Sequence, residues 1–180
     1  MEMTLSEKIL KWCGWNINNN VEIPAKCVIC IAPHTSNWDF IWGNLFNKAM
    51  RAKTHFFMKK EWFRFPLGKF MRALGGIPVD RSKKTSLTDQ IAEEFQKHDQ
   101  FQIGITPEGT RKYNPEWKRG FYYIALKANV PIVLASIDYE KKELGYKKII
   151  YPTGNYDTDI IEIKSFYKNV KGKRPELFGI

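Results

Sequence analysis

Two residues in the first quarter of the chain, His34 and Asp39, form the pair best suited to chemistry. They lie in the stretch Pro33-His34-Thr35-Ser36-Asn37-Trp38-Asp39-Phe40. A histidine can take a proton from an alcohol near neutral pH, and a carboxylate can orient the ring and stabilise the imidazolium. Ser36 stands three residues before Asp39, the spacing of a capping pair that opens a helix. The sequence therefore predicts His34 in a loop and Asp39 in a first helical turn, folded back toward the imidazole.

A second stretch, Gly75-Gly76-Ile77-Pro78-Val79-Asp80-Arg81, has residue types that suit anion binding. The glycines allow a tight turn, and Arg81 leaves the end of a short expected strand. A guanidinium recognises phosphate through two parallel hydrogen bonds. The alternative is a surface arginine paired with Asp80 or another carboxylate.

A third stretch, Thr106-Pro107-Glu108-Gly109-Thr110-Arg111, matches a type I turn, with proline second and glycine fourth. Such a turn would present Glu108, Thr110, Arg111 and free backbone N–H groups at the end of a strand. These donors suit a phosphate or an oxyanion. The stretch does not have the spacing of a P-loop. The alternative to an anion-binding turn is a plain turn without a ligand. The fourth stretch, Val130-Pro131-Ile132-Val133-Leu134, has the composition of a core strand.

The hydrophobic pattern predicts the elements that must position these residues. We expect one or two short helices within 59–74, broken near Pro66. We expect strands at 25–32, 54–58, 77–79, 101–106, 131–137 and 147–151, and helices at 36–50, 82–97, 117–128 and 159–170. Strands that alternate with helices indicate an α/β fold, a single layered domain with a mainly parallel or mixed central sheet flanked by helices.

Length and composition fit that fold. The 180 residues are enough for one domain with a core, and 43% are hydrophobic. The net charge of +10 favours an acidic partner such as anionic lipid, a phosphorylated substrate or nucleic acid. We do not expect a nucleic-acid partner, because basic residues are spread along the chain and no binding motif occurs.

The three cysteines, Cys13, Cys27 and Cys30, indicate reduced thiols and a cytoplasmic protein. Cys27 and Cys30 have the spacing of a zinc-binding pair. They lie in an apolar run without a second ligand pair, so we expect buried strand residues and no metal site. His55 and His98 have no carboxylate at a matching spacing, and we expect both to be structural or solvated.

Residues 1–20 predict an amphipathic N-terminal segment ahead of a main domain over 21–180. Leu5, Ile9, Trp12 and Cys13 recur at helical spacing, beside lysines. Such a helix either lies in a membrane interface or packs on its own domain. The sequence has no 18-residue apolar run and no signal-peptide pattern. The aromatic and basic run 56–65 allows three roles: membrane contact, lining of an acyl channel, or ordinary core.

The four stretches, in this order and at these intervals, resemble the glycerophospholipid acyltransferase family, the 1-acylglycerol-3-phosphate acyltransferase (PlsC-like) group. The pattern is HxxxxD, then GxxxxxR, then PEGTR, then VPIV. Lys118-Arg119-Gly120 also resembles the basic pair and glycine with which this family often opens a helix. The resemblance runs from Ile31 to Ser136, more than half of the chain.

The resemblance implies a role for each matching position. His34 would be the general base on the acceptor hydroxyl, with Asp39 orienting it. Arg81 would bind the acceptor's phosphate, and Glu108, Gly109, Thr110 and Arg111 would complete the acceptor site. The Val130-Pro131 strand would support it.

The resemblance also implies the substrates. The acyl group would come from acyl-CoA or acyl carrier protein, without a metal or other cofactor, and would pass to the hydroxyl of a lysophospholipid such as 1-acylglycerol-3-phosphate. The enzyme would be peripheral on the inner face of the cell membrane. The chain departs from many family members at Pro33, where Asn or Arg is common, and in its N-terminal segment, where a membrane helix is common. Both departures concern the acceptor, so two alternatives stay open: another lipid acceptor (a lyso-aminolipid or glycolipid precursor), or a non-catalytic protein that binds anionic lipid.

Overall fold

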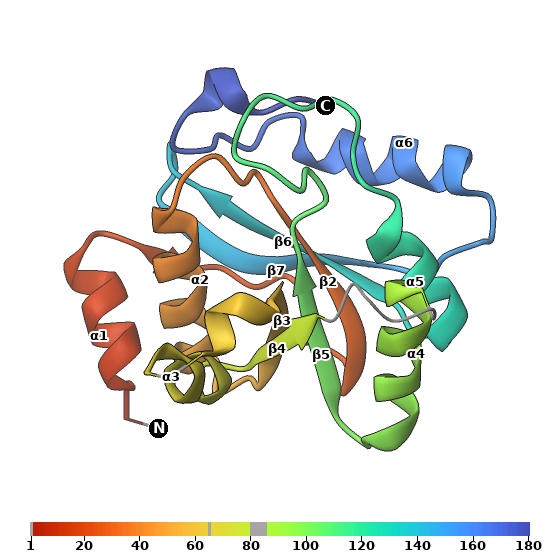
Figure 1. Ribbon diagram of the computed structural model, residues 1–180. Coiled ribbons are helices and arrows are strands. Elements are labelled where there is room, and N and C mark those ends of the chain that lie inside the picture. Colours follow the sequence, from red (N-terminus) through yellow and green to blue (C-terminus); the bar gives the residue numbers. More distant parts are fainter. Residues whose placement is uncertain (1, 65, 80–85) are drawn as a thin grey trace.

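The computed structural model describes residues 2–64, 66–79 and 86–180, which form one mixed sheet covered by helices (Figure 1). The strands are β1 (Asn16–Ile17), β2 (Lys26–Ala32), β3 (Thr54–Lys59), β4 (Gly76–Val79), β5 (Phe101–Ile105), β6 (Ile132–Asp138) and β7 (Glu143–Ile150). The helices are α1 (Leu5–Trp12), α2 (Trp38–Ala49), α3 (Leu67–Ala73), α4 (Leu87–Lys97), α5 (Gly120–Ala128) and α6 (Tyr156–Tyr167), with 3-10 turns at Lys60–Phe63 and Pro175–Leu177.

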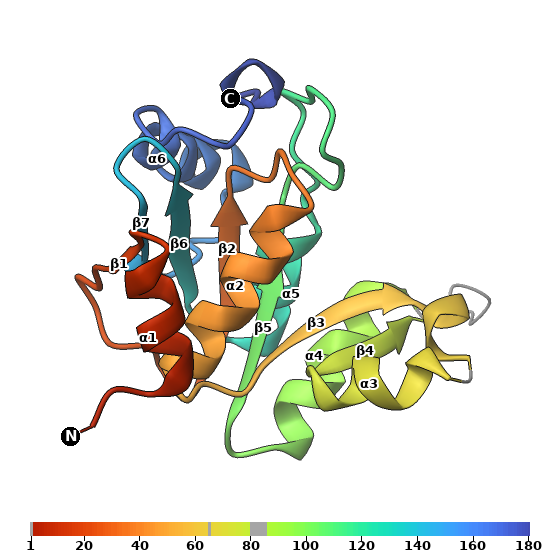
Figure 2. The same cartoon turned by 90° about the vertical axis from the view of Figure 1, so that its left-hand side faces the viewer.

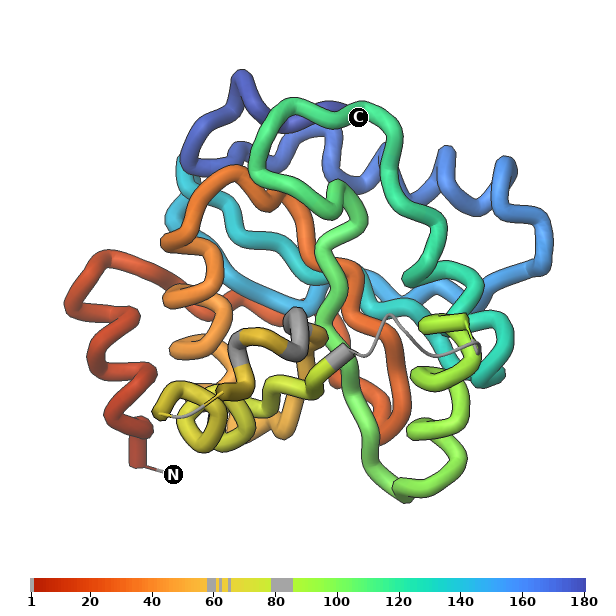
Figure 3. Tube along the Cα trace, in the orientation of Figure 1, coloured from red at the N-terminus to blue at the C-terminus, as the bar shows by residue number. Residues whose placement is uncertain are grey.

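The strand order is β1-β7-β6-β2-β5-β3-β4. All neighbouring pairs are parallel except β6 and β7, which are antiparallel. The predicted α/β class with a mainly parallel or mixed sheet is therefore confirmed. Because β2, β5 and β6 are parallel neighbours, their carboxyl ends lie at one edge of the sheet. Figure 3 shows the connections that follow β2 and β5 close together at that edge.

The two faces of the sheet carry separate hydrophobic cores. Cys27 and Ile29 of β2 face the core that includes Leu10 and Phe46 of the helices α1 and α2. Val28 and Cys30, one residue along, face the core formed with α4, α5 and α6. Successive side chains of a strand point to opposite faces, and here both faces are buried. Residues 27–32 of β2 are therefore apolar at every position, which is the continuous apolar run that predicts this strand.

Several elements differ in their bounds from those expected. The two-residue strand β1 is too short for any hydrophobic pattern to show, and it exists because it pairs with β7. The strand β7 begins at Glu143, four residues before the expected start, because it pairs along the length of β6. The helix α5 begins at Gly120, three residues after the expected start, and Trp117, before it, donates its indole N–H to the Gly179 carbonyl. The helix α6 spans 156–167, where Asn155 caps its start.

The N-terminal segment both packs on the domain and exposes apolar side chains. A capping box of Thr4 and Glu7 begins α1, and Leu10 is buried against the core beside α2. Leu5 and Trp12 are 74% and 88% exposed. Within the described ranges, no helix is long and apolar enough to span a membrane.

The strands β3 and β4 extend away from the rest of the sheet together with α3 (Figure 2). Residues 54–56 of β3 pair with β5, whereas residues 56–59 pair with β4. The strands β3 and β5 thus separate beyond Phe56 and Gly104. Their divergence leaves a space between β5, α2 and α4, which forms part of the site.

Candidate active site

His34 and Asp39 are in contact. The His34 Nδ1 atom lies 3.2 Å from Asp39 Oδ2, and the histidine side chain keeps 18% of its surface exposed. An ionised carboxylate only accepts hydrogen bonds, so Nδ1 carries the proton toward Asp39. The other ring nitrogen, Nε2, is then the free base. This is the arrangement that the spacing of the two residues predicts.

Asp39 is fixed from several sides. Its Oδ2 also accepts hydrogen bonds from the backbone N–H groups of Thr35 and Ser36, both at 2.9 Å. Its Oδ1 accepts one from the Tyr139 hydroxyl at 2.6 Å. Burial alone would raise the pKa of Asp39, but the hydrogen bonds from His34, Tyr139 and Ser36 outweigh burial and hold this pKa below its usual value. The carboxylate is therefore charged at neutral pH.

The helix start differs in detail from the predicted capping pair. Asp39 does reach back to the Ser36 backbone, but the Ser36 hydroxyl accepts from Trp38 N at 3.2 Å. Asn37 occupies the cap position and makes no side-chain capping bond. The Asp39 carboxylate thus binds the backbone of the loop that carries His34, and it does not form a capping box with Ser36.

Glu108 points inward to the same loop. Its carboxylate oxygens lie 2.9 and 3.1 Å from the backbone nitrogen of His34, and the residue is 2% exposed. Burial raises the pKa of Glu108 to about 7, although the hydrogen bond from His34 N opposes this rise. Direct contact of Glu108 with substrate stays a prediction; the contact present in the structure holds the backbone of His34.

The raised pKa of Glu108 predicts a pH-dependent stability. Between pH 4.5 and about 7 the folded protein keeps a proton that the unfolded chain loses, so this group lowers stability as pH rises through that window. We expect Glu108→Gln, which can still accept from His34 N, to be more stable than wild type by about 1–3 kcal/mol at pH 8. The difference should vanish near pH 4.5.

Urea unfolding at both pH values measures this effect, with Glu116→Gln as the control because Glu116 is exposed on the same connection. A wild type as stable as Glu108→Gln at pH 8 would show that burial does not penalise the Glu108 carboxylate.

The turn after β5 forms as predicted. Gly109 N donates to the Thr106 carbonyl at 3.2 Å, and Gly109 has a φ of +67°, which favours glycine. A small, mainly polar pocket of about 240 Å³ opens on this turn, lined by His34, Thr106, Gly109, Thr110 and Arg111. Three of the four residues predicted in this turn therefore line the same pocket as His34.

Arg81 lies outside the described residues, so its predicted place in the site rests on the sequence. The strand β4, which precedes it, ends at Val79. The Val130-Pro131 stretch leads into β6, which is buried along its whole length and pairs with β2.

A larger and mainly apolar cavity of about 590 Å³ shares His34, Thr106, Gly109 and Arg111 with the polar pocket. It continues along α2 past Gly43 and Asn47 to Thr54 at the start of β3. On the other face of the sheet it reaches Ile91 of α4. The divergence of β3 from β5 leaves room for it, so His34 stands where an apolar cavity meets a polar one.

The structure also places the cysteines, the other two histidines and part of the aromatic run. Cys27 and Cys30 are buried residues of β2, as expected. His98 is exposed at the end of α4, and His55 stacks on Phe101 with ring centroids 4.8 Å apart. Phe56 and Phe57 of the aromatic run line the large cavity.

Sequence reasoning missed Tyr139, which follows β6 and is the partner of Asp39 Oδ1. It is separated from Asp39 by 100 residues, and no local spacing connects the two. A polar aromatic residue directly after a buried strand at the carboxyl edge of the sheet is the signal that could have indicated it.

Comparisons with known proteins show the family of this chain and the similarity of its fold. The sequence profile of the Acyltransferase family matches residues 15–138. A human protein, 1-acyl-sn-glycerol-3-phosphate acyltransferase beta, is 27% identical over 105 residues, which cover 56% of this chain and 38% of the human one. The crystal structure of the 1-acyl-sn-glycerophosphate (LPA) acyltransferase PlsC from Thermotoga maritima is similar with a TM-score of 0.62 and 18% identity. That alignment covers 91% of this chain and 73% of that one.

Because the family profile spans more than half of the chain, the chain belongs to the Acyltransferase family. The structural similarity shows a shared fold. The chain spans little more than a third of the length of the human relative.

Proposed function

We propose that this protein transfers a fatty acyl group from a thioester, acyl-CoA or acyl carrier protein, to the hydroxyl of a lysophospholipid such as 1-acylglycerol-3-phosphate. The observation that carries this proposal is the His34–Asp39 pair at the junction of an apolar cavity and a polar pocket. The family and the names of the relatives support it.

The proposed reaction uses His34 as a general base. Its Nε2 takes the proton of the acceptor hydroxyl while the oxygen attacks the thioester carbonyl. Asp39 stabilises the imidazolium that forms. The tetrahedral intermediate then collapses: the carbon–sulfur bond breaks, the thiolate takes the proton from His34, and the new ester leaves. A thioester is already reactive, so positioning and this proton transfer are the main tasks, and the step as written requires no cofactor.

The polar pocket is the proposed site of the acceptor's phosphate. Arg111 and Thr110 line it beside His34, and a guanidinium and a hydroxyl are both suited to phosphate oxygens. We propose that Arg81 adds a second guanidinium. Glu108 then contributes by holding His34, and Gly109 by allowing the turn that carries Thr110 and Arg111.

The apolar cavity is the proposed channel for the donor's acyl chain. Gly43 of α2 lines it, and a side chain at this position would meet no atom within 4 Å. On the opposite wall, a Cβ at Gly104 would lie 3.0 Å from Ile31 Cδ1. These two glycines keep the cavity open between α2 and the sheet, and Phe56 and Phe57 extend its apolar lining.

Filling this space should shorten the accepted chain. We expect Gly43→Leu to lower kcat/KM for a long-chain thioester by about tenfold, the equivalent of roughly 1.4 kcal/mol, while a short-chain thioester is used as before. Gly43→Ala is the matched control, because it makes the same change in helix propensity without filling the cavity. Equal losses for short and long chains would show that the acyl chain does not lie along α2.

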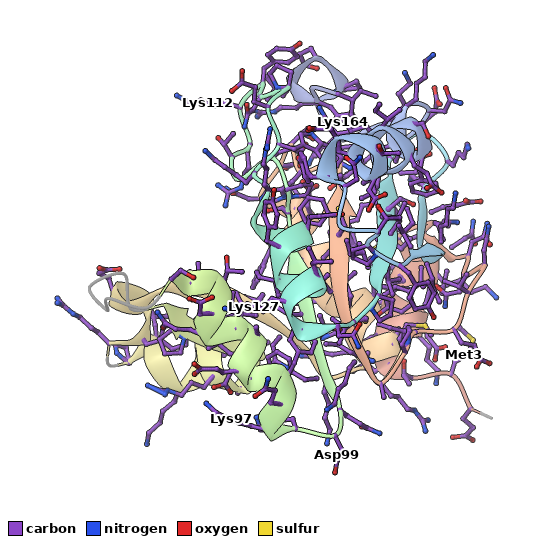
Figure 4. All side chains as sticks on the ribbon, turned by 90° about the vertical axis from the view of Figure 1, so that its right-hand side faces the viewer. Met3, Lys97, Asp99, Lys112, Lys127 and Lys164 are labelled. Carbon is purple, nitrogen blue, oxygen red and sulfur yellow. The ribbon has the colours of Figure 1, made fainter. Side chains whose placement is uncertain are left out.

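We also propose that the protein acts at the surface of a membrane, peripherally and on its cytoplasmic side. Seven of the exposed large apolar side chains lie on α1, α2 and α3, and α1 lies beside α2 (Figure 2). They are Leu5, Trp12, Trp38, Phe40, Ile41, Leu67 and Phe70. The net charge of +10 favours an anionic lipid surface. Figure 4 shows the opposite side of the molecule, where Lys97 and Lys127 form ion pairs with Glu94 and Asp89.

A panel of acceptors tests the function. Purified protein is given an acyl thioester with lysophosphatidate, a lyso-aminolipid or a glycolipid precursor, and the ester product is identified by mass spectrometry. We expect lysophosphatidate to be acylated fastest, and the lipid profile of cells that lack the protein should show the same deficit. Vesicle binding without any ester product would instead support the non-catalytic lipid-binding alternative.

A further inference from the structure

The carboxylate of Asp39 has two oxygens with different tasks. Oδ2 accepts from His34 Nδ1 and from the backbone N–H groups of Thr35 and Ser36. Oδ1 accepts from the Tyr139 hydroxyl at 2.6 Å, the shortest of the four hydrogen bonds. Rotation of the carboxylate would move Oδ2 away from His34, and the bond at Oδ1 opposes that rotation.

Tyr139 is itself held in place. Its backbone N–H donates to the Lys171 carbonyl at 2.8 Å. Its ring packs edge-on against Trp15, with ring centroids 5.0 Å apart and an interplanar angle of 83°. Trp15 in turn packs on Trp42 of α2 at 5.2 Å, and the Trp42 side chain faces the Tyr139 hydroxyl. A hydroxyl fixed from three segments of the chain provides a preorganised donor.

We propose that Tyr139 is a positioning residue of the acyltransferase site, whose hydroxyl holds the Asp39 carboxylate in the orientation that contacts His34. The inference rests on the proposed function, because it assigns a residue to the proposed general base. Tyr139 does not touch the reacting atoms in this account; it acts through Asp39.

The charged and titratable groups near Asp39 come from several elements. His34 belongs to the same loop, Glu108 to the connection after β5, and Tyr139 to the end of β6. From the C-terminal segment, the Lys173 ammonium lies over the Trp38 ring, 4.9 Å from its centroid. Of these groups, His34 and Tyr139 donate to Asp39 through their side chains. Loss of the Tyr139 hydroxyl therefore raises the pKa of Asp39, because this hydrogen bond favours the carboxylate.

Tyr139→Phe is the test, with Tyr122→Phe as its matched control. The Tyr122 hydroxyl also donates to a buried carboxylate, Asp159 at 2.8 Å, but it lies on the face of the sheet covered by α5 and α6. We expect Tyr139→Phe to lower kcat about tenfold and to move the acid limb of the pH–rate profile to higher pH, because a carboxylate without this hydrogen bond holds a proton of the His34–Asp39 pair more readily. Tyr122→Phe should change stability but leave the acid limb in place.

A double-mutant cycle separates positioning from general stability. In an Asp39→Asn background, Tyr139→Phe should change kcat less than twofold, because the group through which it acts is already altered. A full tenfold loss in that background, or an acid limb that does not move in Tyr139→Phe, would overturn the proposal. If wild type transfers no acyl group to any acceptor, the proposed function is wrong. If wild type is active and Tyr139→Phe has the same kcat and the same pH–rate profile, only the role of Tyr139 is wrong.

Discussion

Replacing His34 by alanine is expected to lower kcat/KM for acyl transfer by about 10²–10⁴, the range of a positioned general base. Its Nδ1 is committed to Asp39, and Nε2 is the base that the proposed reaction needs. Substrate binding should change little, because the walls of both cavities come mainly from other residues. The measurement is initial-rate kinetics of thiol release with acceptor present, together with a thermal unfolding curve that confirms an intact fold.

The control for His34→Ala is His98→Ala, which removes an exposed histidine at the end of α4. Activity within twofold of wild type is expected for that variant. Thiol release by His34→Ala at the wild-type rate would show that His34 is not the general base.

Asp39→Asn has the second largest expected effect, a loss of about 10²–10³ in kcat. The amide keeps the shape of the carboxylate but has one acceptor oxygen in place of two. It therefore cannot accept from the Tyr139 hydroxyl and, at the same time, from Thr35 N, Ser36 N and His34 Nδ1. The ring can then adopt the wrong tautomer, and the imidazolium loses its counter-charge. A buried group that loses acceptors also destabilises the fold, here by about 1–3 kcal/mol.

The diagnostic measurement for Asp39 is kcat of the double variant with His34→Ala. Residues that act as one unit give non-additive losses, so the double variant should be about as slow as His34→Ala alone. Losses that multiply would mean that Asp39 acts independently of His34.

The local part of the site could be predicted from sequence because it depends on local geometry. His34 and Asp39 are five residues apart, and the helix start that follows β2 is enough to join them. The turn at Gly109 is likewise specified by its own residues. The alternation of elements also predicts the class of fold, since a strand such as β2 that is apolar on both faces needs helices on both sides.

The long-range part could not be predicted in this way. Tyr139 reaches Asp39 because β6 pairs with β2, and the sequence does not specify that strand order. Glu108 has the appearance of an outward turn residue, yet the pairing of Cys30 with Ile105 places its side chain beside the His34 backbone. The strand β1 has no pattern of its own and depends on β7.

The central claim is that His34 and Asp39 activate an acceptor hydroxyl for acyl transfer. The most direct measurement incubates wild type and His34→Ala with an acyl thioester and lysophosphatidate, and quantifies free thiol and new ester by mass spectrometry. The proposed function predicts equal amounts of thiol and ester from wild type, and at most a trace of either from His34→Ala. Thiol release without ester in wild type, or equal ester from both proteins, would contradict it.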